Sequence, residues 1–385
     1  MSVKIDNRNL WFDLIRGLSA VAVCASHLRN ALLVDYSKAT HPWAGLKFFY
    51  TATSLGHEAV MVFFVLSGYF VGGSVVGRGS RFKWGDYAEA RLTRLWVVLI
   101  PALALTLGMD LIAKHFDPEN QAWNSGPGAR HPWSMSPLTA LGNVFFLHTV
   151  AVPVFGSNLP LWSLAYEFWY YALFPLFVCA LGWAGSFSKI LRIGQLIVMA
   201  CLLFLLPPRL LAWGLIWLLG VGVFYYPKYQ WRKAKILAVV AFLSFVGALL
   251  VSTEYILRGF KADFAVGMSF AFLAAVLKGI PFPFGPRVEH VSRFLSEISY
   301  SLYVVHFPIM LCAMAVFYPG SQFQPDAAGF GVFAIWLAAA LLAGAGFWWI
   351  FEKRTQNIRK WISRMRKNGG YKVLPVGVIA DSKKN

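Results

Sequence analysis

The sequence predicts an all-α polytopic membrane protein. Of its 385 residues, 58% are hydrophobic, 17% are aromatic and only 14% are charged, whereas roughly 25% of the residues in a soluble domain are charged. Several apolar runs reach the ~18–20 residues that a helix needs to cross about 30 Å of hydrocarbon. These observations exclude a secreted disulfide scaffold, a disordered chain and a soluble nucleic-acid-binding protein.

Ten membrane-spanning helices are predicted from apolar runs that are separated by basic or Pro/Gly-rich breaks. They cover residues 10–31, 54–77, 95–112, 161–182, 190–206, 210–226, 236–252, 263–280, 298–317 and 328–351. A weaker apolar run, 138–156, contains His148 and Pro153, and loop charge indicates whether it crosses. If it does not cross, most Lys and Arg residues lie on the cytoplasmic side, as the positive-inside rule requires; if it crosses, most lie outside. We therefore expect ten spans, both termini in the cytoplasm, and one long external segment, 113–160, with a hydrophobic helix that does not span.

Residues 1–355 are predicted to form a single transmembrane domain, followed by a basic, partly disordered cytoplasmic tail at 356–385. The first apolar run carries Asp13 and Arg16 and lacks a small-residue cleavage site, so no cleaved signal peptide is expected. The net charge of +18 is attributed to loops that face anionic lipid and not to nucleic-acid binding. The four cysteines lie in apolar segments without metal or redox spacing, so no metal site is expected.

Ionisable residues within the spans are the main functional signal, because each costs several kcal/mol in hydrocarbon. In the first span, Arg16 and His27 are eleven residues apart, which places them ~20° from a common helix face with a rise of ~16 Å. Asp13 lies on the same stripe. Such a stripe faces a polar path through the protein, or alternatively packs against neighbouring helices with Asp13 and Arg16 paired.

Three further segments contribute charged residues. Arg91 and Arg94 are i, i+3 neighbours where a span enters from the cytoplasm, and their guanidinium groups suit phosphate, with ordinary lipid contact as the alternative. Glu58 is the second residue of the segment HEAVMVFFVLSGYFVGG, whose small residues permit close helix packing. Glu167 lies within WSLAYEFWYYALFP, beside Trp162 and other aromatic residues.

The segment ISYSLYVVHFP adds Ser301, Tyr303 and His306 to one span. Hydrogen bonding between packed helices is the alternative role for Ser301 and His306. From depth in the ten-span arrangement, we expect the three arginines near the cytoplasmic face. His27, Glu58 and Glu167 are expected in the outer half, where they would form an acid/base cluster.

These segments, in this order, resemble the acyltransferase-3 family of integral membrane O-acyltransferases. The matching features are Arg16 and His27 with ten residues between them, FVLSGYF, the Arg91-x-x-Arg94 pair, WSLAYEFWYYALFP and ISYSLYVVHFP. The resemblance covers most of the chain. It implies transfer of an acyl group, usually acetyl, from cytoplasmic acyl-CoA to a hydroxyl of a glycan or other acceptor at or across the membrane.

The resemblance also implies roles for individual residues. His27 matches the essential histidine of the family, as general base or acyl relay, and Arg16 and Glu167 are the other catalytic candidates. Arg91 and Arg94, with Arg16, are expected to bind acyl-CoA. The candidates for substrate binding are Glu58, Trp162, Ser301, Tyr303 and His306. The expected partners are acyl-CoA, a glycan or lipid-linked glycan acceptor and membrane lipid, in a bacterial inner membrane.

Three other interpretations remain open from the residues alone. A proton-coupled transporter would use His27, Glu58 and Glu167 as a relay, and a paired-repeat architecture would favour it. A different membrane acyltransferase fold would act on lipid or protein acceptors. A non-catalytic membrane scaffold is disfavoured by the number of intramembrane charges.

Overall fold

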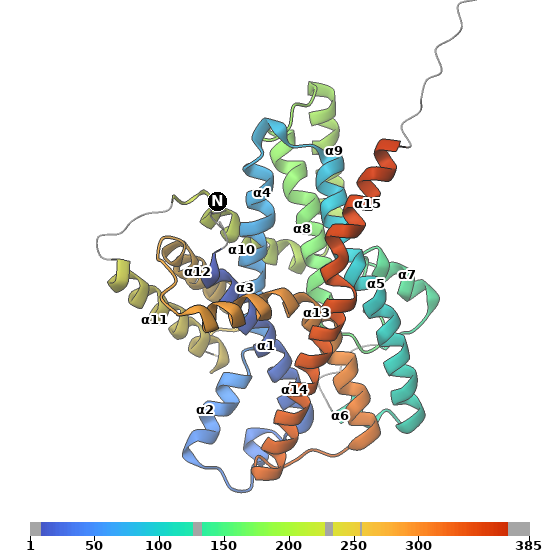
Figure 1. The fold of residues 1–385 in the computed structure, drawn as a ribbon, viewed down its shortest axis with the longest axis vertical. Helices are drawn as coiled ribbons and strands as arrows, with labels where there is room; N and C mark the ends of the chain where they lie inside the picture. Colours follow the sequence, from blue (N-terminus) through green and yellow to red (C-terminus); the bar gives the residue numbers. More distant parts are fainter. Residues whose placement is uncertain (1–8, 126–132, 228–233, 255, 369–385) are drawn as a thin grey trace, which may run out of the picture.

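The computed structural model describes residues 9–125, 133–227, 234–254 and 256–368, and these residues are almost entirely helical (Figure 1). Each of the ten apolar runs predicted to span contains a helix. Seven helical segments in the described residues are long and apolar enough to cross a membrane. They are Ala44–Val76, Trp84–Phe116, Pro208–Tyr225, Lys235–Thr253, Phe260–Leu277, Pro286–Phe317 and Ala327–Met365. The chain is therefore a multi-pass membrane protein, and ten spans and the side on which each terminus lies stay predictions.

The first third of the chain forms a series of helices. Its elements are α1 (Leu10–Leu32), α2 (Ala44–Thr53), α3 (Gly56–Ser67), the π-helical turn η2 (Gly68–Gly72), α4 (Gly73–Val76) and α5 (Trp84–Phe116). Figure 1 shows α1 descending, α3 and α4 ascending, and α5 descending. Asn9 caps α1 by accepting a hydrogen bond from the backbone N–H of Trp11 at 3.1 Å, which satisfies one of the free donors at a helix start.

The middle of the chain contains a segment that enters the protein without crossing it. Its elements are α6 (Gln121–Ser125), α7 (Pro137–Val144), α8 (Leu161–Ala180), α9 (Lys189–Leu205) and α10 (Pro208–Tyr225). Helix α7 has 8 residues and is thus only ~12 Å long, too short to span. The loop after α7 buries His148 and Asn158, and α8 begins at the buried residue Leu161. The start of α8 therefore lies inside the protein and not at its surface.

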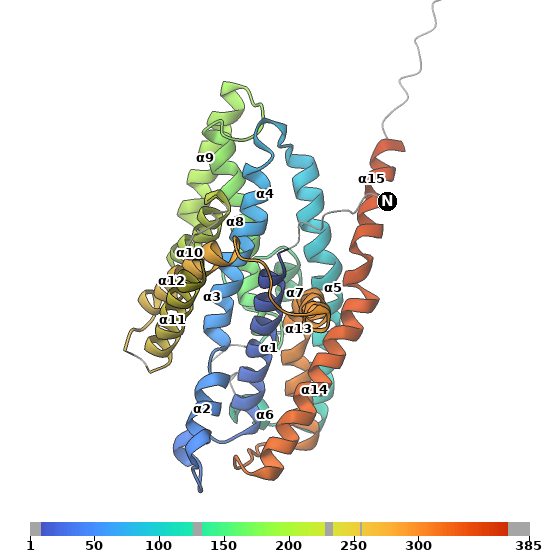
Figure 2. The same cartoon turned by 60° about the vertical axis from the view of Figure 1, so that its left-hand side comes forward.

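The last third of the chain supplies the central helix of the fold. Its elements are α11 (Ala234–Thr253), α12 (Phe260–Leu277), α13 (Pro286–Phe317), α14 (Ala327–Ile350), the 3₁₀ turn η4 (Glu352–Arg354) and α15 (Thr355–Asn368). Helix α13 packs against α1, α5 and α14. Its first part crosses in front of α1 in Figure 1 and is viewed end-on in Figure 2, and its second part descends beside α14. A Cβ at Gly17 would touch Leu295, so α1 and α13 approach closely at this crossing.

Small residues of η2 let α10 approach backbone to backbone, as the sequence predicts. A Cβ at Gly68 would overlap the backbone oxygen of Trp217, and one at Gly220 would overlap the backbone oxygen of Val65. Such contact between helices is possible only where both lack a side chain. The π-helical turn of η2 is a geometry that is frequently found at functional sites.

The predicted cytoplasmic tail begins as a helix. Residues 355–368 form α15, which continues the direction of α14 (Figure 2). Arg359 on α15 forms an ion pair with Glu89 on α5 at 3.8 Å. The rest of the tail, 369–385, lies outside the described residues, as does the prediction that it is disordered.

Candidate functional site

A polar cavity of about 720 Å³ lies between α1, α5, α8, α13 and the segment from α14 to α15. We call it the arginine cavity. Its charged and hydroxyl-bearing lining residues are Asp13, Arg16, Ser67, Tyr69, Arg91, Arg94, Glu167, Tyr171, Ser296, Glu297, Tyr300, Glu352 and Thr355. Charged groups of both signs thus converge from α1, α5, α8, α13 and η4, although they are far apart in the sequence.

The three predicted arginines share this cavity. Arg16 comes from α1, and Arg91 and Arg94 come from successive turns of α5. Among the described residues, no carboxylate forms an ion pair with any of the three. Within the described part of the chain, the Nε of Arg91 is buried and has no hydrogen-bond partner, while its guanidinium lies 5.7 Å from the centroid of the Tyr87 ring. The guanidinium groups are therefore free to bind an anion from outside the chain.

The nearby carboxylates are held by hydroxyl groups. Tyr171 donates to Glu167 Oε2 at 2.9 Å, and Ser301 donates to Glu352 Oε2 at 2.7 Å. Ser67 lies 3.1 Å from the hydroxyl of Tyr171, which links the end of α3 to this network. These hydrogen bonds fix the carboxylates in place through hydroxyl donors and not through the guanidinium groups.

Asp13 is held in the same way at the edge of the cavity. Its Oδ1 accepts a hydrogen bond from Ser296 Oγ at 2.8 Å, which ties α1 to α13. The side chain is buried. Asp13 therefore has a positioning contact to α13 beside Arg16, and it faces the polar side of α1 as its spacing predicts.

A second, smaller cavity of about 60 Å³ continues from the arginine cavity toward the centre of the protein. Both cavities are lined by Arg16, Glu167 and Tyr300. The smaller one ends at Tyr303, whose hydroxyl lies 2.7 Å from Ser163 Oγ and donates to a backbone oxygen of the loop before α8 at 2.9 Å. It is large enough for ordered water but not for a substrate.

His27 and His306 form a pair beyond Tyr303. Nδ1 of His27 lies 2.8 Å from Nε2 of His306, and their rings stack with centroids 5.1 Å apart and planes at 7°. Nδ1 of His306 lies 2.9 Å from the carbonyl oxygen of Leu302. Because a carbonyl only accepts, Nδ1 of His306 carries the proton and its Nε2 is the acceptor. Nδ1–H of His27 then donates, and the lone pair of neutral His27 is on Nε2.

Tyr303 separates the histidine pair from the cavities. The rings of Tyr303 and His306 have centroids 6.1 Å apart, and Phe63 packs on Tyr303 at 5.9 Å. Neither the arginine cavity nor the smaller cavity is lined by His27. The polar path predicted from the stripe on α1 is therefore not one continuous cavity through these two spaces, because the smaller one reaches only to Tyr303.

The predicted acid/base cluster of His27, Glu58 and Glu167 does not form. Glu167 lies in the arginine cavity with Arg16, because α8 starts inside the protein and carries Glu167 to that depth. Glu58 lies on another side of α1, where its Oε1 accepts a hydrogen bond from Ser252 at 2.7 Å. Among the described residues, the ionisable side chain that contacts His27 is that of His306.

The other candidates for substrate binding are likewise divided among four places. Ser301 supports Glu352 beside the arginine cavity, Tyr303 closes the small cavity, and His306 pairs with His27. Trp162 packs instead against His57, with ring centroids 6.3 Å apart.

Sequence reasoning missed three features of these sites. Glu352 follows the last apolar run, where a carboxylate has no distinguishing signal. Tyr171 was one of several aromatic residues around Glu167. His57 forms an ion pair with the buried Asp263 at 2.8 Å, and the adjacent His-Glu dipeptide at the start of a span was the only available signal for it.

A lipid-exposed bundle with a buried, multi-helix polar site defines an integral membrane protein with a ligand-binding or catalytic function. The family model described as an acyltransferase domain matches residues 9–352. The chain therefore belongs to the acyltransferase-3 family and is a membrane acyltransferase. Comparison with curated proteins and with solved structures gave no match.

Proposed function

We propose that the protein transfers an acyl group, most simply acetyl, from cytoplasmic acyl-CoA to a hydroxyl of a cell-surface or exported glycan. Family membership supports acyl transfer. Acyl-CoA is proposed as the donor because of the arginine cavity. Its three guanidinium groups have no ion pair among the described residues.

In this proposal the phosphates of acyl-CoA bind Arg91 and Arg94. Guanidinium groups bind phosphate through paired charge-assisted hydrogen bonds. Arg16 lines both the arginine cavity and the smaller cavity that reaches Tyr303. It is therefore suited to contact the part of acyl-CoA between the phosphates and the thioester. The cavity side would face the cytoplasm of a bacterial inner membrane, with ten spans and both termini cytoplasmic, because Lys and Arg collect on that side.

The chemical step is assigned to His27. Its Nε2 removes the proton from the acceptor hydroxyl as the oxygen attacks the carbonyl carbon of the thioester. The C–S bond then breaks, and the CoA thiolate takes up the proton from the imidazolium. His306 holds Nδ1–H of His27, which directs the lone pair of Nε2 to the acceptor. No metal is required for this sequence of bond changes.

Movement of Tyr303 is part of the proposal. Its ring lies between the small cavity and the histidine pair, so the thioester reaches His27 only when this side chain is displaced. The hydroxyl contacts of Tyr303 with Ser163 and Pro160 would hold the passage closed until the donor binds.

Family membership does not favour the transporter interpretation. The separation of Glu58 and Glu167 from His27 also removes the relay on which that interpretation depended.

The proposed function is tested in cells of the source organism. The gene is inactivated and complemented with the wild type, with His27→Ala or with His115→Ala, a variant at an exposed histidine at the end of α5. NMR of purified surface and exported glycans is expected to show O-acyl signals with the wild type and His115→Ala but not with His27→Ala. Unchanged O-acyl signals after inactivation would contradict the proposal.

A further inference from the structure

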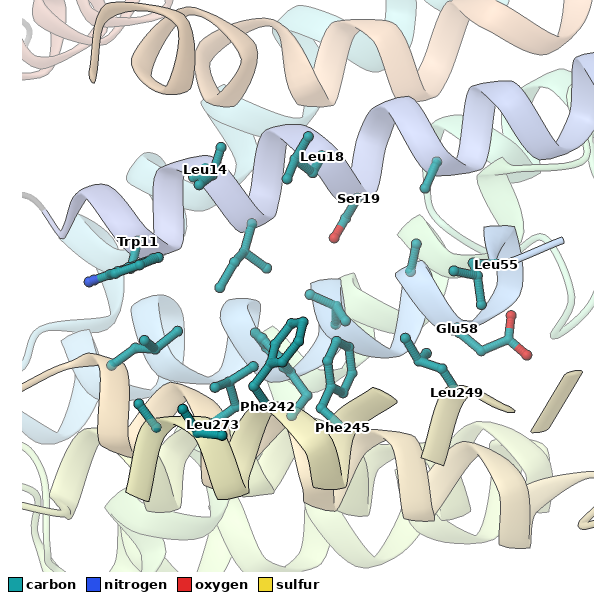
Figure 3. Close-up of a pocket in the computed structure, with 18 residues that line it drawn as sticks. Trp11, Leu14, Leu18, Ser19, Leu55, Glu58, Phe242, Phe245, Leu249 and Leu273 are labelled. Carbon is teal, nitrogen blue, oxygen red and sulfur yellow. The ribbon is translucent and has the colours of Figure 1, made fainter. Parts of the chain in front are cut away.

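An apolar groove of about 480 Å³ runs between α1, α3, α11 and α12, apart from the arginine cavity (Figure 3). Its walls are almost entirely hydrocarbon, with Trp11 at one end and Leu55, Leu249 and Glu58 at the other. Leu18 and Phe242 lie on its walls and are 52% and 55% exposed, so the groove opens at the molecular surface. Because α3, α11 and α12 belong to segments that are apolar enough to span, this opening faces lipid.

The groove and the histidine pair use different sides of α1. Leu18 is nine residues before His27, which places it ~180° around the helix. Gly56, two residues before Glu58, packs on Ser26, and a Cβ there would lie 2.7 Å from the Ser26 side chain. The Glu58 end of the groove is therefore level with His27 along α1, although it opens on the other side.

The two ends of the groove differ in chemistry. At one end, Trp11 packs edge-on against Phe282 and Phe284 at 5.2 and 5.7 Å. At the other end, Glu58 is 7% exposed, and its Oε2 is buried with no hydrogen-bond partner among the residues that the structure describes. A buried carboxylate oxygen without a hydrogen-bond donor is costly. A ligand with a hydroxyl group would supply the missing donor at this end of the groove.

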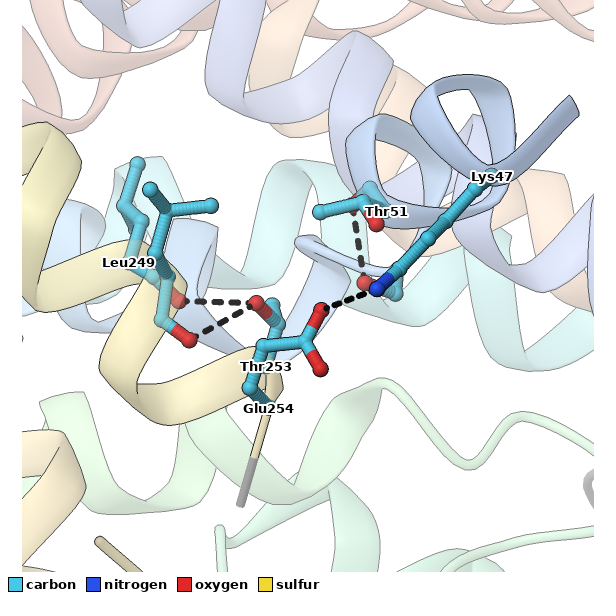
Figure 4. A network of polar contacts seen from close by, with 7 residues as sticks. Lys47, Thr51, Leu249, Thr253 and Glu254 are labelled. Atoms are coloured by element: carbon cyan, nitrogen blue, oxygen red, sulfur yellow. Dashed lines mark hydrogen bonds and ion pairs between the residues drawn. The ribbon is translucent and has the colours of Figure 1, made fainter. Parts of the chain in front are cut away.

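Polar and aromatic groups extend outward from the Glu58 end. His57, the neighbour of Glu58, is paired with Asp263, and Trp162 packs against the His57 ring. Figure 4 shows that Lys47 on α2 reaches Glu254, just beyond the end of α11, with an ion pair of 3.4 Å. Aromatic rings beside hydrogen-bonding groups suit a sugar, whereas the groove suits only a hydrocarbon chain.

We propose that this groove binds the acceptor as a membrane lipid with a hydroxylated, sugar-like head group. The hydrocarbon chain lies along α1 and α11 with its end toward Trp11, and a head-group hydroxyl donates to Glu58 Oε2. This inference rests on the proposed function and narrows it, because the acceptor is then a lipid-linked glycan presented from the bilayer.

The experiment uses photolabelling of the full-length protein in phosphatidylcholine nanodiscs without acyl-CoA. The probe is an alkyl β-glucoside with a diazirine at the end of the chain, and its adducts are mapped by mass spectrometry. We expect adducts near Trp11 that are competed by unlabelled alkyl glucoside and not by an alkyl phosphocholine of the same length. Even labelling of all lipid-facing helices, or equal competition by both compounds, would overturn the proposal.

Variants on one helix separate groove binding from general lipid contact. Ala238 lines the groove, whereas Val240 is an exposed residue of α11 outside the groove lining. Ala238→Trp is expected to reduce groove adducts at least tenfold and Val240→Trp to leave them unchanged. Glu58→Leu is expected to weaken competition by the glucoside about tenfold, because the head-group hydroxyl loses its hydrogen-bond acceptor. Unchanged labelling in Ala238→Trp, or unchanged competition in Glu58→Leu, would overturn the assignment.

This measurement is independent of acyl transfer. If the groove is labelled as expected but no acylated glycan forms in the cellular test, the lipid site stands and the proposed function fails. If acyl transfer occurs but the groove is not labelled, only the lipid site fails.

Discussion

The imidazole Nδ1 of His27 lies 2.8 Å from Nε2 of His306, although the two residues are 279 positions apart. The carbonyl of Leu302 fixes the proton on the far nitrogen of His306, so His306 can only accept from His27. This one contact determines which nitrogen of His27 carries the lone pair, and several of the predictions below depend on it.

His306 is expected to act as a positioning residue. His306→Ala should lower kcat about 10²-fold and leave KM for acyl-CoA unchanged, because the general base is misoriented while the donor site is intact. His306→Gln should restore part of kcat, since its side-chain oxygen can accept from Nδ1–H of His27. Steady-state kinetics of purified protein measure both constants. An equal effect of Ala and Gln, or a change confined to KM, would count against this role.

Arg91 and Arg94 are expected to bind the donor phosphates. Replacing both with Ala should raise KM for acyl-CoA by ~10–100-fold, since each charge-assisted hydrogen bond contributes about 1.5–3 kcal/mol. Arg81→Ala is the matched control, because Arg81 is an exposed arginine just before α5 that does not line the cavity. Binding measured by thermal shift with acyl-CoA should weaken in the double variant alone. Equal weakening in Arg81→Ala would indicate a general charge effect.

The backbone contact between η2 and α10 is expected to limit substitution at Gly68. Gly68→Ala should destabilise the protein by about 1–3 kcal/mol, because the new methyl overlaps the oxygen of Trp217. Gly222→Ala, on the same α10 helix, has nothing within 4 Å and should be neutral or slightly stabilising. Thermal unfolding in detergent compares the two. A stable Gly68→Ala protein would show that the helices do not touch there.

His148 gives the loop before α8 a pH-dependent stability. Burial lowers the pKa of His148 to about 4, below its usual value, and its Nδ1 has no partner among the described residues. Because the folded pKa is depressed, the stabilisation is complete above about pH 6.5 and is lost as the pH falls toward 4. The loss amounts to about 3 kcal/mol.

The check is the unfolding midpoint of wild type and of His148→Gln at pH 7 and pH 5. His148→Gln should lose less stability between the two pH values, since Gln can still donate to the oxygen of Leu161 but does not titrate. His115→Gln, at an exposed histidine, should behave as the wild type. If the unfolding midpoint of His148→Gln falls as much between pH 7 and pH 5 as that of the wild type, the acid sensitivity belongs to other groups.

The sequence predicted the elements that depend on local pattern. The stripe of Asp13, Arg16 and His27 follows from helix periodicity, and α1 is a continuous helix that carries all three. The spacing of Arg91 and Arg94 likewise places both in one cavity. Gly68 permits close packing because it lacks a side chain, a property that does not depend on the partner.

The depth of a side chain within the protein, and the identity of its hydrogen-bond partner, could not be predicted in the same way. Glu167 was expected in the outer half because a span was taken to begin at the membrane surface, but the loop before α8 enters the protein. The choice of His306 as the partner of His27, and of Ser252 as the partner of Glu58, depends on how distant helices pack. A single sequence contains no signal for such pairs.

The most direct test of the central claim separates donor binding from chemistry at His27. Purified wild type and His27→Ala are compared for acyl-CoA binding by thermal shift and for transfer of a ¹³C-acyl group to a glycan acceptor by NMR. We expect His27→Ala to bind acyl-CoA as the wild type does and to transfer at least ~10²-fold more slowly. Transfer by His27→Ala at the wild-type rate would contradict the assignment of His27 as the base.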